Sequence, residues 1–111
     1  MPKSIGERRS QRIILDVPVV IQGVAASKKI FQEDTFTLIV NAHGALLMLE
    51  RKVALGQRLV VMNPKTWDEC QGKVAFVGPP YAGLARVGIE FTRPAPGFWP
   101  VNSPPADWKL T

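Results

Sequence analysis

The sequence predicts an all-β protein, a closed or nearly closed antiparallel barrel of six strands. Short runs rich in β-branched and aromatic residues alternate with Gly, Pro and Asn, the residues that favour tight turns. No long segment has the helical period, and 111 residues are enough for one modest core. A sandwich of two sheets is the nearest alternative.

Each predicted strand is bounded by turn-forming residues. Pro18 restricts the first run to an edge, a bulge or a bend, because proline has no amide hydrogen to donate. Residues 23–29 form a turn and the entry to the next strand, and residues 41–44 (NAHG) reverse the chain. The expected strands cover residues 13–21, 35–40, 45–49, 57–62, 71–77 and 84–91.

The two ends differ in composition from the barrel. Residues 1–11 are polar and basic and predict a flexible N-terminal arm, so that the barrel covers residues 12–92. Residues 93–111 are rich in proline and aromatic residues and predict a tail that packs on the barrel, with Phe98 and Trp99 as anchors. A short helical turn is expected at residues 104–108.

Charge and cysteine content restrict the class of protein. The formal charge of +5 suits nucleic acid, nucleotides, acidic lipids or an acidic protein. No apolar stretch is long enough to span a membrane and no signal core is present, so we expect a cytoplasmic location. Cys70 has no second cysteine with which to form an internal disulfide or a cysteine metal site.

The residue types needed for catalysis do not form a familiar pattern. His43 is the sole histidine and lies in a predicted turn. The serines lack the glycine pattern of a nucleophile elbow, and neither a phosphate-binding loop nor a dinucleotide fingerprint is present. We therefore expect a protein that is not an enzyme and that needs neither a metal nor a cofactor.

Three arginines, Arg8, Arg9 and Arg12, precede the first strand in the segment ERRSQR. A guanidinium group matches phosphate oxygens or the O6/N7 edge of guanine with two parallel hydrogen bonds, and its face stacks on bases. An arm bearing these arginines is suited to close over an anionic ligand on the barrel. A solvated basic tail is the alternative on composition alone.

Two features together resemble the PilZ domain family, over about residues 7–92. Residues 8–12 match its R-x-x-x-R motif directly before the first strand, and residues 87–91 (VGIEF) are similar to its last barrel strand. The family's second motif, D/N-x-S-x-x-G, falls at the turn after the second predicted strand. The resemblance implies a bacterial six-stranded barrel that binds the second messenger cyclic di-GMP.

The second motif admits two alignments. With Gly44 on the family glycine, Asn41 takes the serine position and Ile39 takes the acidic or Asn position. Isoleucine lacks the oxygen that would accept the guanine N1 and N2 protons. The other alignment places Asn41 and His43 on the polar positions but puts Leu46 on the glycine, so we prefer the first.

The resemblance implies a receptor or adaptor for cyclic di-GMP, which orders its arginine arm on binding and signals to an unidentified effector protein. The degenerate alternative is a PilZ-like protein-interaction module that does not bind the ligand. Nonspecific nucleic-acid binding fits the charge but lacks the strand-borne aromatic platform that such barrels use. The implied ligand-binding residues are Arg8, Arg9, Arg12, Asn41, His43 and Gly44.

Overall fold

The computed structural model describes residues 10–24, 28–101 and 104–108. Arg8 and Arg9 lie outside the described residues, as does most of the predicted arm. Within these described ranges, seven strands and two short 3₁₀ turns follow one another. They are β1 (Ile13–Ile14), β2 (Pro18–Val24), β3 (Ile30–Asn41), β4 (Gly44–Leu49), β5 (Arg58–Met62), β6 (Glu69–Val77), β7 (Ala85–Phe91), η1 (Pro96–Phe98) and η2 (Ala106–Trp108).

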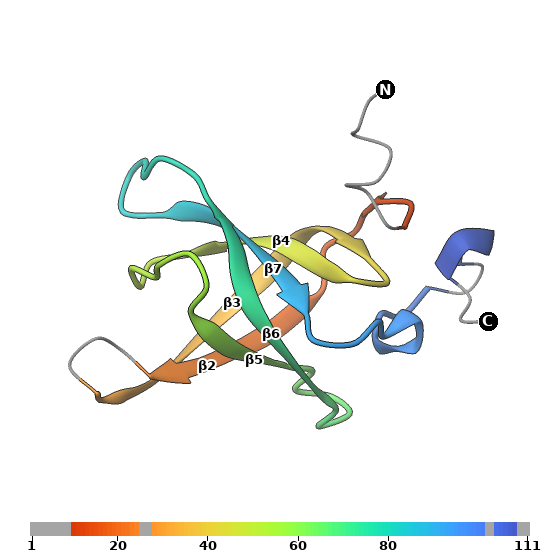
Figure 1. The fold of residues 1–111 in the computed structure, drawn as a ribbon, viewed down its shortest axis with the longest axis horizontal. Coiled ribbons are helices and arrows are strands. Elements are labelled where there is room, and N and C mark those ends of the chain that lie inside the picture. The colour runs from red at the N-terminus through yellow and green to blue at the C-terminus, as the bar shows by residue number, and fades with distance from the viewer. Residues whose placement is uncertain (1–9, 25–27, 102–103, 109–111) are drawn as a thin grey trace.

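Six of the strands close into an antiparallel barrel (Figure 1). The hydrogen-bonded order β3-β2-β5-β6-β7-β4 returns to its start because β4 also pairs with β3, and β1 adds one short strand to β3. Closure leaves the barrel without free edges. The predicted fold class is confirmed, and the sandwich alternative is wrong.

The first predicted strand is divided by Pro18. Residues 15–17 leave the ladder between β1 and β2, and the hydroxyl of Thr37 accepts a hydrogen bond from the Val17 amide at 2.9 Å. The same hydroxyl donates to the Leu15 carbonyl at 2.6 Å. A buried threonine on β3 therefore replaces the backbone partners that the bend removes. Pro18 is the first residue of β2, a position at which a strand tolerates the missing amide hydrogen of proline.

The second strand is longer than the sequence predicts. β3 begins at Ile30 and pairs with β2 through its polar half, where Gln32, Glu33 and Asp34 face Gln22, Ile21 and Val20. Exposed and partly buried residues alternate there. The polar composition gives no strand signal in the sequence, although the backbone pairing with β2 defines a strand. In this half Phe31 carries the inward apolar contact.

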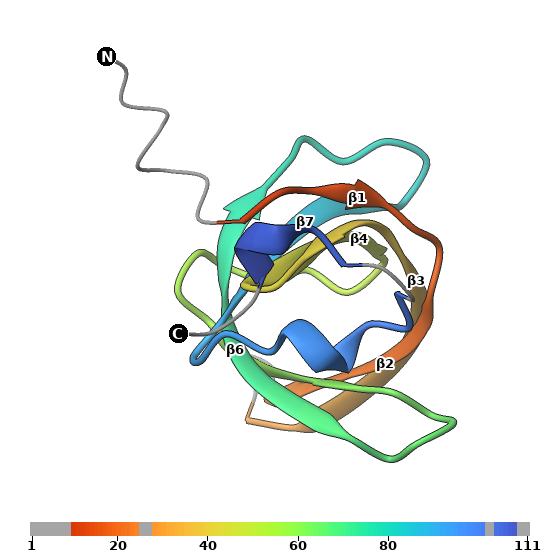
Figure 2. The ribbon, with the colours of Figure 1, turned by 90° about the vertical axis from the view of Figure 1, so that its right-hand side faces the viewer.

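The core fills the barrel and continues into the C-terminal tail. Phe98, Trp99 and Trp108 are buried, and Phe91 at the end of β7 contacts both Phe98 and Trp99 at ring-centroid distances of 5.8 and 5.9 Å. Figure 2 shows η1 and η2 lying across one end of the barrel. η1 was not expected from the sequence, although Pro96 opens it at a position where proline is favoured.

No helix of the described residues is long and apolar enough to cross a membrane.

Candidate functional site

The turn between β3 and β4 gathers the predicted binding residues that the structure describes. Arg12, Asn41, His43 and Gly44 all line one surface hollow with a volume of about 510 Å³. Arg12 comes from the segment before β1, Asn41 ends β3, His43 lies in the turn, and Gly44 begins β4. Arg8 and Arg9 are outside the described residues, so their place relative to the hollow stays a prediction.

Gly44 is required by the close approach of a neighbouring strand. A Cβ atom built at this position would lie 1.9 Å from the carbonyl oxygen of Ile89 on β7, closer than any side chain tolerates. The Asn41 side-chain oxygen accepts the His43 amide at 2.8 Å, which fixes the turn from within. The sequence therefore folds here into a rigid tip from which Asn41 and His43 reach the hollow.

Ser10, which the sequence analysis did not single out, attaches the arm to this tip. Its side chain is fully buried. Its hydroxyl oxygen accepts a hydrogen bond from the Ala42 amide at 3.1 Å and lies 3.1 Å from Nδ1 of His43. The Asn41 side-chain amide also donates to the Ser10 carbonyl at 3.4 Å. The centre of the arginine motif is thus fixed beside the hollow. In the sequence, the only indication of this attachment was a small hydroxyl residue between arginines.

A serine hydroxyl on a histidine nitrogen also occurs in hydrolases, where histidine activates the nucleophile. Here the hydroxyl of Ser10 is enclosed and already accepts the Ala42 amide. A substrate carbonyl has no route to an oxygen with no exposed surface. The pair of Ser10 and His43 therefore holds the arm and the turn together.

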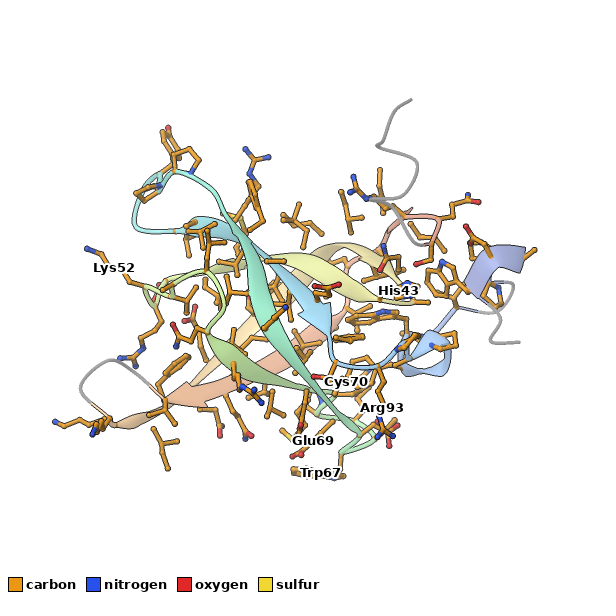
Figure 3. All side chains as sticks on the ribbon, viewed as in Figure 1. His43, Lys52, Trp67, Glu69, Cys70 and Arg93 are labelled. Carbon is orange, nitrogen blue, oxygen red and sulfur yellow. The ribbon has the colours of Figure 1, made fainter. Side chains whose placement is uncertain are left out.

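The C-terminal tail supports the turn from behind. The indole nitrogen of Trp99 donates to the Asn41 carbonyl at 2.8 Å, and the Ala95 amide donates to the Ala42 carbonyl at 2.7 Å. Figure 3 shows His43 between the start of the described chain and the C-terminal turns. The Asn41 and Ala42 carbonyls thus find partners in residues more than fifty positions away.

The same tail also holds the arm. Trp108 donates from its indole nitrogen to the Gln11 carbonyl at 2.7 Å, and the Gln11 amide donates to the Asp107 carboxylate at 3.1 Å. Both main-chain polar groups of Gln11 are therefore satisfied by η2. Arm, turn and tail form one hydrogen-bonded unit next to the hollow.

The floor of the hollow is apolar, and its rim is polar. Ile39, Leu46 and Phe76 line it together with the predicted polar residues, and Glu90 contributes a carboxylate. Ile39 thus faces the hollow, as the preferred alignment of the second motif expects for that position. Phe76 and Glu90 were not predicted, although outward alternation along the last strand indicates Glu90.

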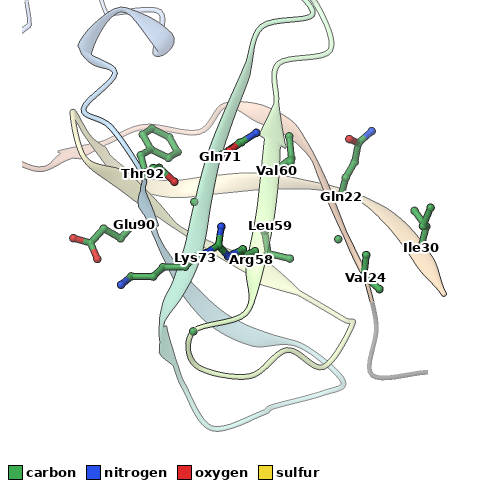
Figure 4. Close-up of a pocket in the computed structure, with 14 residues that line it drawn as sticks. Gln22, Val24, Ile30, Arg58, Leu59, Val60, Gln71, Lys73, Glu90 and Thr92 are labelled. Atoms are coloured by element: carbon green, nitrogen blue, oxygen red, sulfur yellow. The ribbon is translucent and has the colours of Figure 1, made fainter. Parts of the chain in front are cut away.

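A second and larger hollow, of about 790 Å³, lies over β2, β5 and β6 (Figure 4). Arg58 and Lys73 line it and face each other in the register of β5 and β6. None of the four predicted site residues that the structure describes contributes to it. Glu90 lines both hollows, but the other lining residues differ, so this hollow offers a second place against which the predicted site can be tested.

Cys70 is half-buried on β6, outside both hollows. Burial raises the pKa of its thiol to about 11, with a smaller contribution from the negative charge of Asp68. The thiol is therefore protonated near neutral pH, which disfavours nucleophilic or metal-binding chemistry. Within the described ranges no group of three or more His, Cys, Asp or Glu side chains gathers into a candidate metal site.

The closed antiparallel barrel with its one extra strand matches a PilZ-like fold. Among solved structures, the chain is similar to the Bacillus subtilis inhibitor of motility MotI/DgrA, a PilZ-domain protein. The identity is 19%, the TM-score is 0.58, and the match covers 81% of this chain and 44% of that chain. No family model and no curated protein matches the sequence. At this identity the likeness concerns the fold.

Proposed function

We propose that the protein is a PilZ-like receptor for cyclic di-GMP that acts as an adaptor. The observation that carries the proposal is the convergence of Arg12, Asn41, His43 and Gly44 on one hollow. These residues come from two segments that are about thirty positions apart in the sequence. Arg12 and Gly44 match positions of the two family motifs, Asn41 takes the serine position of the second motif, and His43 lies between Asn41 and Gly44. Arg12 supplies a cation for phosphate, and the amide of Asn41 both donates and accepts.

The attachment of Ser10 supports a role for the other two arginines. Arg8 is two residues from Ser10, a distance of at most about 7 Å along an extended backbone. A long arginine side chain at either position 8 or position 9 can therefore reach a ligand in the hollow. Binding would hold the arm over the ligand and present a changed surface to an effector protein.

A specific observation favours a second candidate, a PilZ-like interaction module without the ligand. Ile39 stands at the position where the family has an acid or Asn, and its side chain lines the hollow. An apolar floor of Ile39, Leu46 and Phe76 is also compatible with a partner protein's side chains. In this candidate the arginines would bind acidic groups of that partner.

Isothermal titration calorimetry with cyclic di-GMP tests the receptor proposal. We expect saturable binding to the natural protein and a loss of at least about 100-fold in affinity for the Arg8→Ala, Arg12→Ala double variant. The reason is that each hydrogen bond to a charged group contributes about 1.5–3 kcal/mol.

The matched control is the Arg58→Ala, Arg86→Ala double variant. Like the first double variant, it removes two arginine charges, but from exposed strand positions outside the hollow that Arg12 lines. Its affinity should stay within about threefold of the natural protein, because distant exposed charges are screened by salt. Absence of heat with the natural protein contradicts the receptor proposal and favours the interaction module. Equal losses in both double variants contradict the assignment of the site.

A further inference from the structure

Two β-bulges turn apolar side chains outward into the same hollow. In β6 the register with β7 shifts between Val74 and Phe76, so Phe76 stands opposite Gly88 on the outer surface. Strict alternation from the buried Val74 would have turned residue 76 inward. The bulge therefore exposes about half of a phenylalanine, 49% of its side chain, that the barrel interior would otherwise hold.

The second bulge lies in β3, between Thr37 and Ile39. Thr37 is buried and faces the interior, and without the extra residue Ile39 would do the same. With the shift, Ile39 stands opposite Leu46 on β4 and lines the hollow. Bulges are common next to functional sites, where they redirect a side chain.

The side chains of Ile39 and Phe76 lie at the two ends of one continuous row. Across the strands the directly opposed residues are Ile39, Leu46, Gly88 and Phe76, and all four line the hollow. Three strand spacings give the row a length of about 14 Å. Gly88 has no side chain, so the row is shallowest near its middle. A Cβ atom at Gly88 would lie 3.1 Å from Cβ of Phe76. The row is a shallow apolar floor with an aromatic ring at one end.

The neighbouring row is polar and lies two residues further along β3, β4 and β7 and three residues along β6, where Lys73 lines the other hollow. Asn41 stands opposite Gly44, Gly44 opposite Glu90, and Glu90 opposite Lys73. Arg12 and His43 line the hollow on this side. A ligand that fits both rows has a planar apolar face at one end and, next to Arg12 and Asn41, anionic and hydrogen-bonding groups at the other, which is the chemistry of a purine nucleotide.

We propose that the outward row from Ile39 to Phe76 is a base-stacking floor, on which a purine base of the bound nucleotide lies against the Phe76 ring. The inference rests on the proposed function and adds the subsite for the base. It also gives Ile39 a role, because an isoleucine at this position extends the floor where an acid would interrupt it. The hollow has a volume of about 510 Å³ and is open to solvent, so its occupant is a small nucleotide that lies on the barrel surface.

Variants of Phe76, measured by calorimetry with cyclic di-GMP, test the floor. Phe76→Leu should weaken binding about 5- to 150-fold, the range for loss of one stacked base. Phe76→Trp should bind with an affinity close to that of the natural protein, because a larger aromatic ring still stacks. The control is Phe36→Leu, which changes an exposed phenylalanine on β3 outside the hollow and should bind as the natural protein does.

A second readout separates stacking from a general effect on the fold. The H8 proton resonance of the ligand should move upfield on binding to the natural protein and to Phe76→Trp, and should lose most of that shift with Phe76→Leu. Unchanged affinity and an unchanged H8 shift in Phe76→Leu overturn the floor and leave the receptor function standing. If the natural protein does not bind cyclic di-GMP, the receptor function fails and the floor fails with it.

Discussion

At the scale of single residues, Ser10 contributes more to the site than its size suggests. Its hydroxyl connects the arginine segment to the backbone of Ala42 and to the ring of His43. Arginine side chains on a free tail would lose most of their binding energy to the entropy of ordering. An anchored Ser10 reduces that cost for Arg12 and for any arginine within two residues of it.

Replacing Ser10 by Ala tests this anchor. The Ala42 amide would be left buried without its acceptor, so we expect the free energy of unfolding in urea to fall by about 1–3 kcal/mol. The control Thr92→Ala removes a hydroxyl from an exposed position and should change it by less than about 0.5 kcal/mol. Equal stabilities of the two variants would show that Ser10 anchors nothing.

At the scale of elements, the C-terminal turns belong to the site as much as to the fold. The residues on either side of η1, Ala95 and Trp99, donate to the carbonyls of the turn between β3 and β4, and η2 holds both polar groups of Gln11. The sequence predicts that Phe98 and Trp99 pack on the barrel, because aromatic residues in a proline-rich tail must bury their rings. It gives no indication that the indole nitrogens of Trp99 and Trp108 select carbonyls of the turn and of the arm.

Two tryptophans provide a matched test of this element. Trp108 is 1% exposed and donates to Gln11, whereas Trp67 is 73% exposed in the loop before β6. Trp108→Ala should lower the free energy of unfolding by about 3–5 kcal/mol, and Trp67→Ala should change it by less than about 0.5 kcal/mol. The measurement is urea denaturation followed by circular dichroism. Similar values for both variants would mean that η2 is not part of the folded core.

The predicted strands succeed or fail for physical reasons that differ between elements. Runs such as residues 45–49 and 57–62 are found because their β-branched and aliphatic residues alternate with turn signals. The first half of β3 is missed because its outward residues are polar, and its backbone pairing with β2 overrides that composition. Bulges leave no trace in residue type, so Ile39 and Phe76 are assigned to the outer surface only when the register is known.

At the scale of the whole molecule, barrel closure turns scattered residues into a site. Arg12, Asn41, His43 and Gly44 are recognisable from two short motifs, because arginines before a strand and glycine in a turn have local signatures. Ser10, Phe76 and Glu90 join them through strand pairings and long-range contacts. The contact between Ser10 and His43, for example, spans 33 residues. Such long-range neighbours follow from topology, which one sequence does not specify by pattern alone.

The described part of the barrel presents more than one hollow, and the central claim is that the hollow beside the turn between β3 and β4 receives the ligand. Amide chemical-shift mapping of the ¹⁵N-labelled protein during titration with cyclic di-GMP tests this claim most directly. We expect the largest shifts at Arg12, at residues 41–44, and at Phe76 and Gly88. Shifts centred on Arg58, Gln71 and Lys73 in the other hollow, or no shifts at saturating ligand, would contradict it.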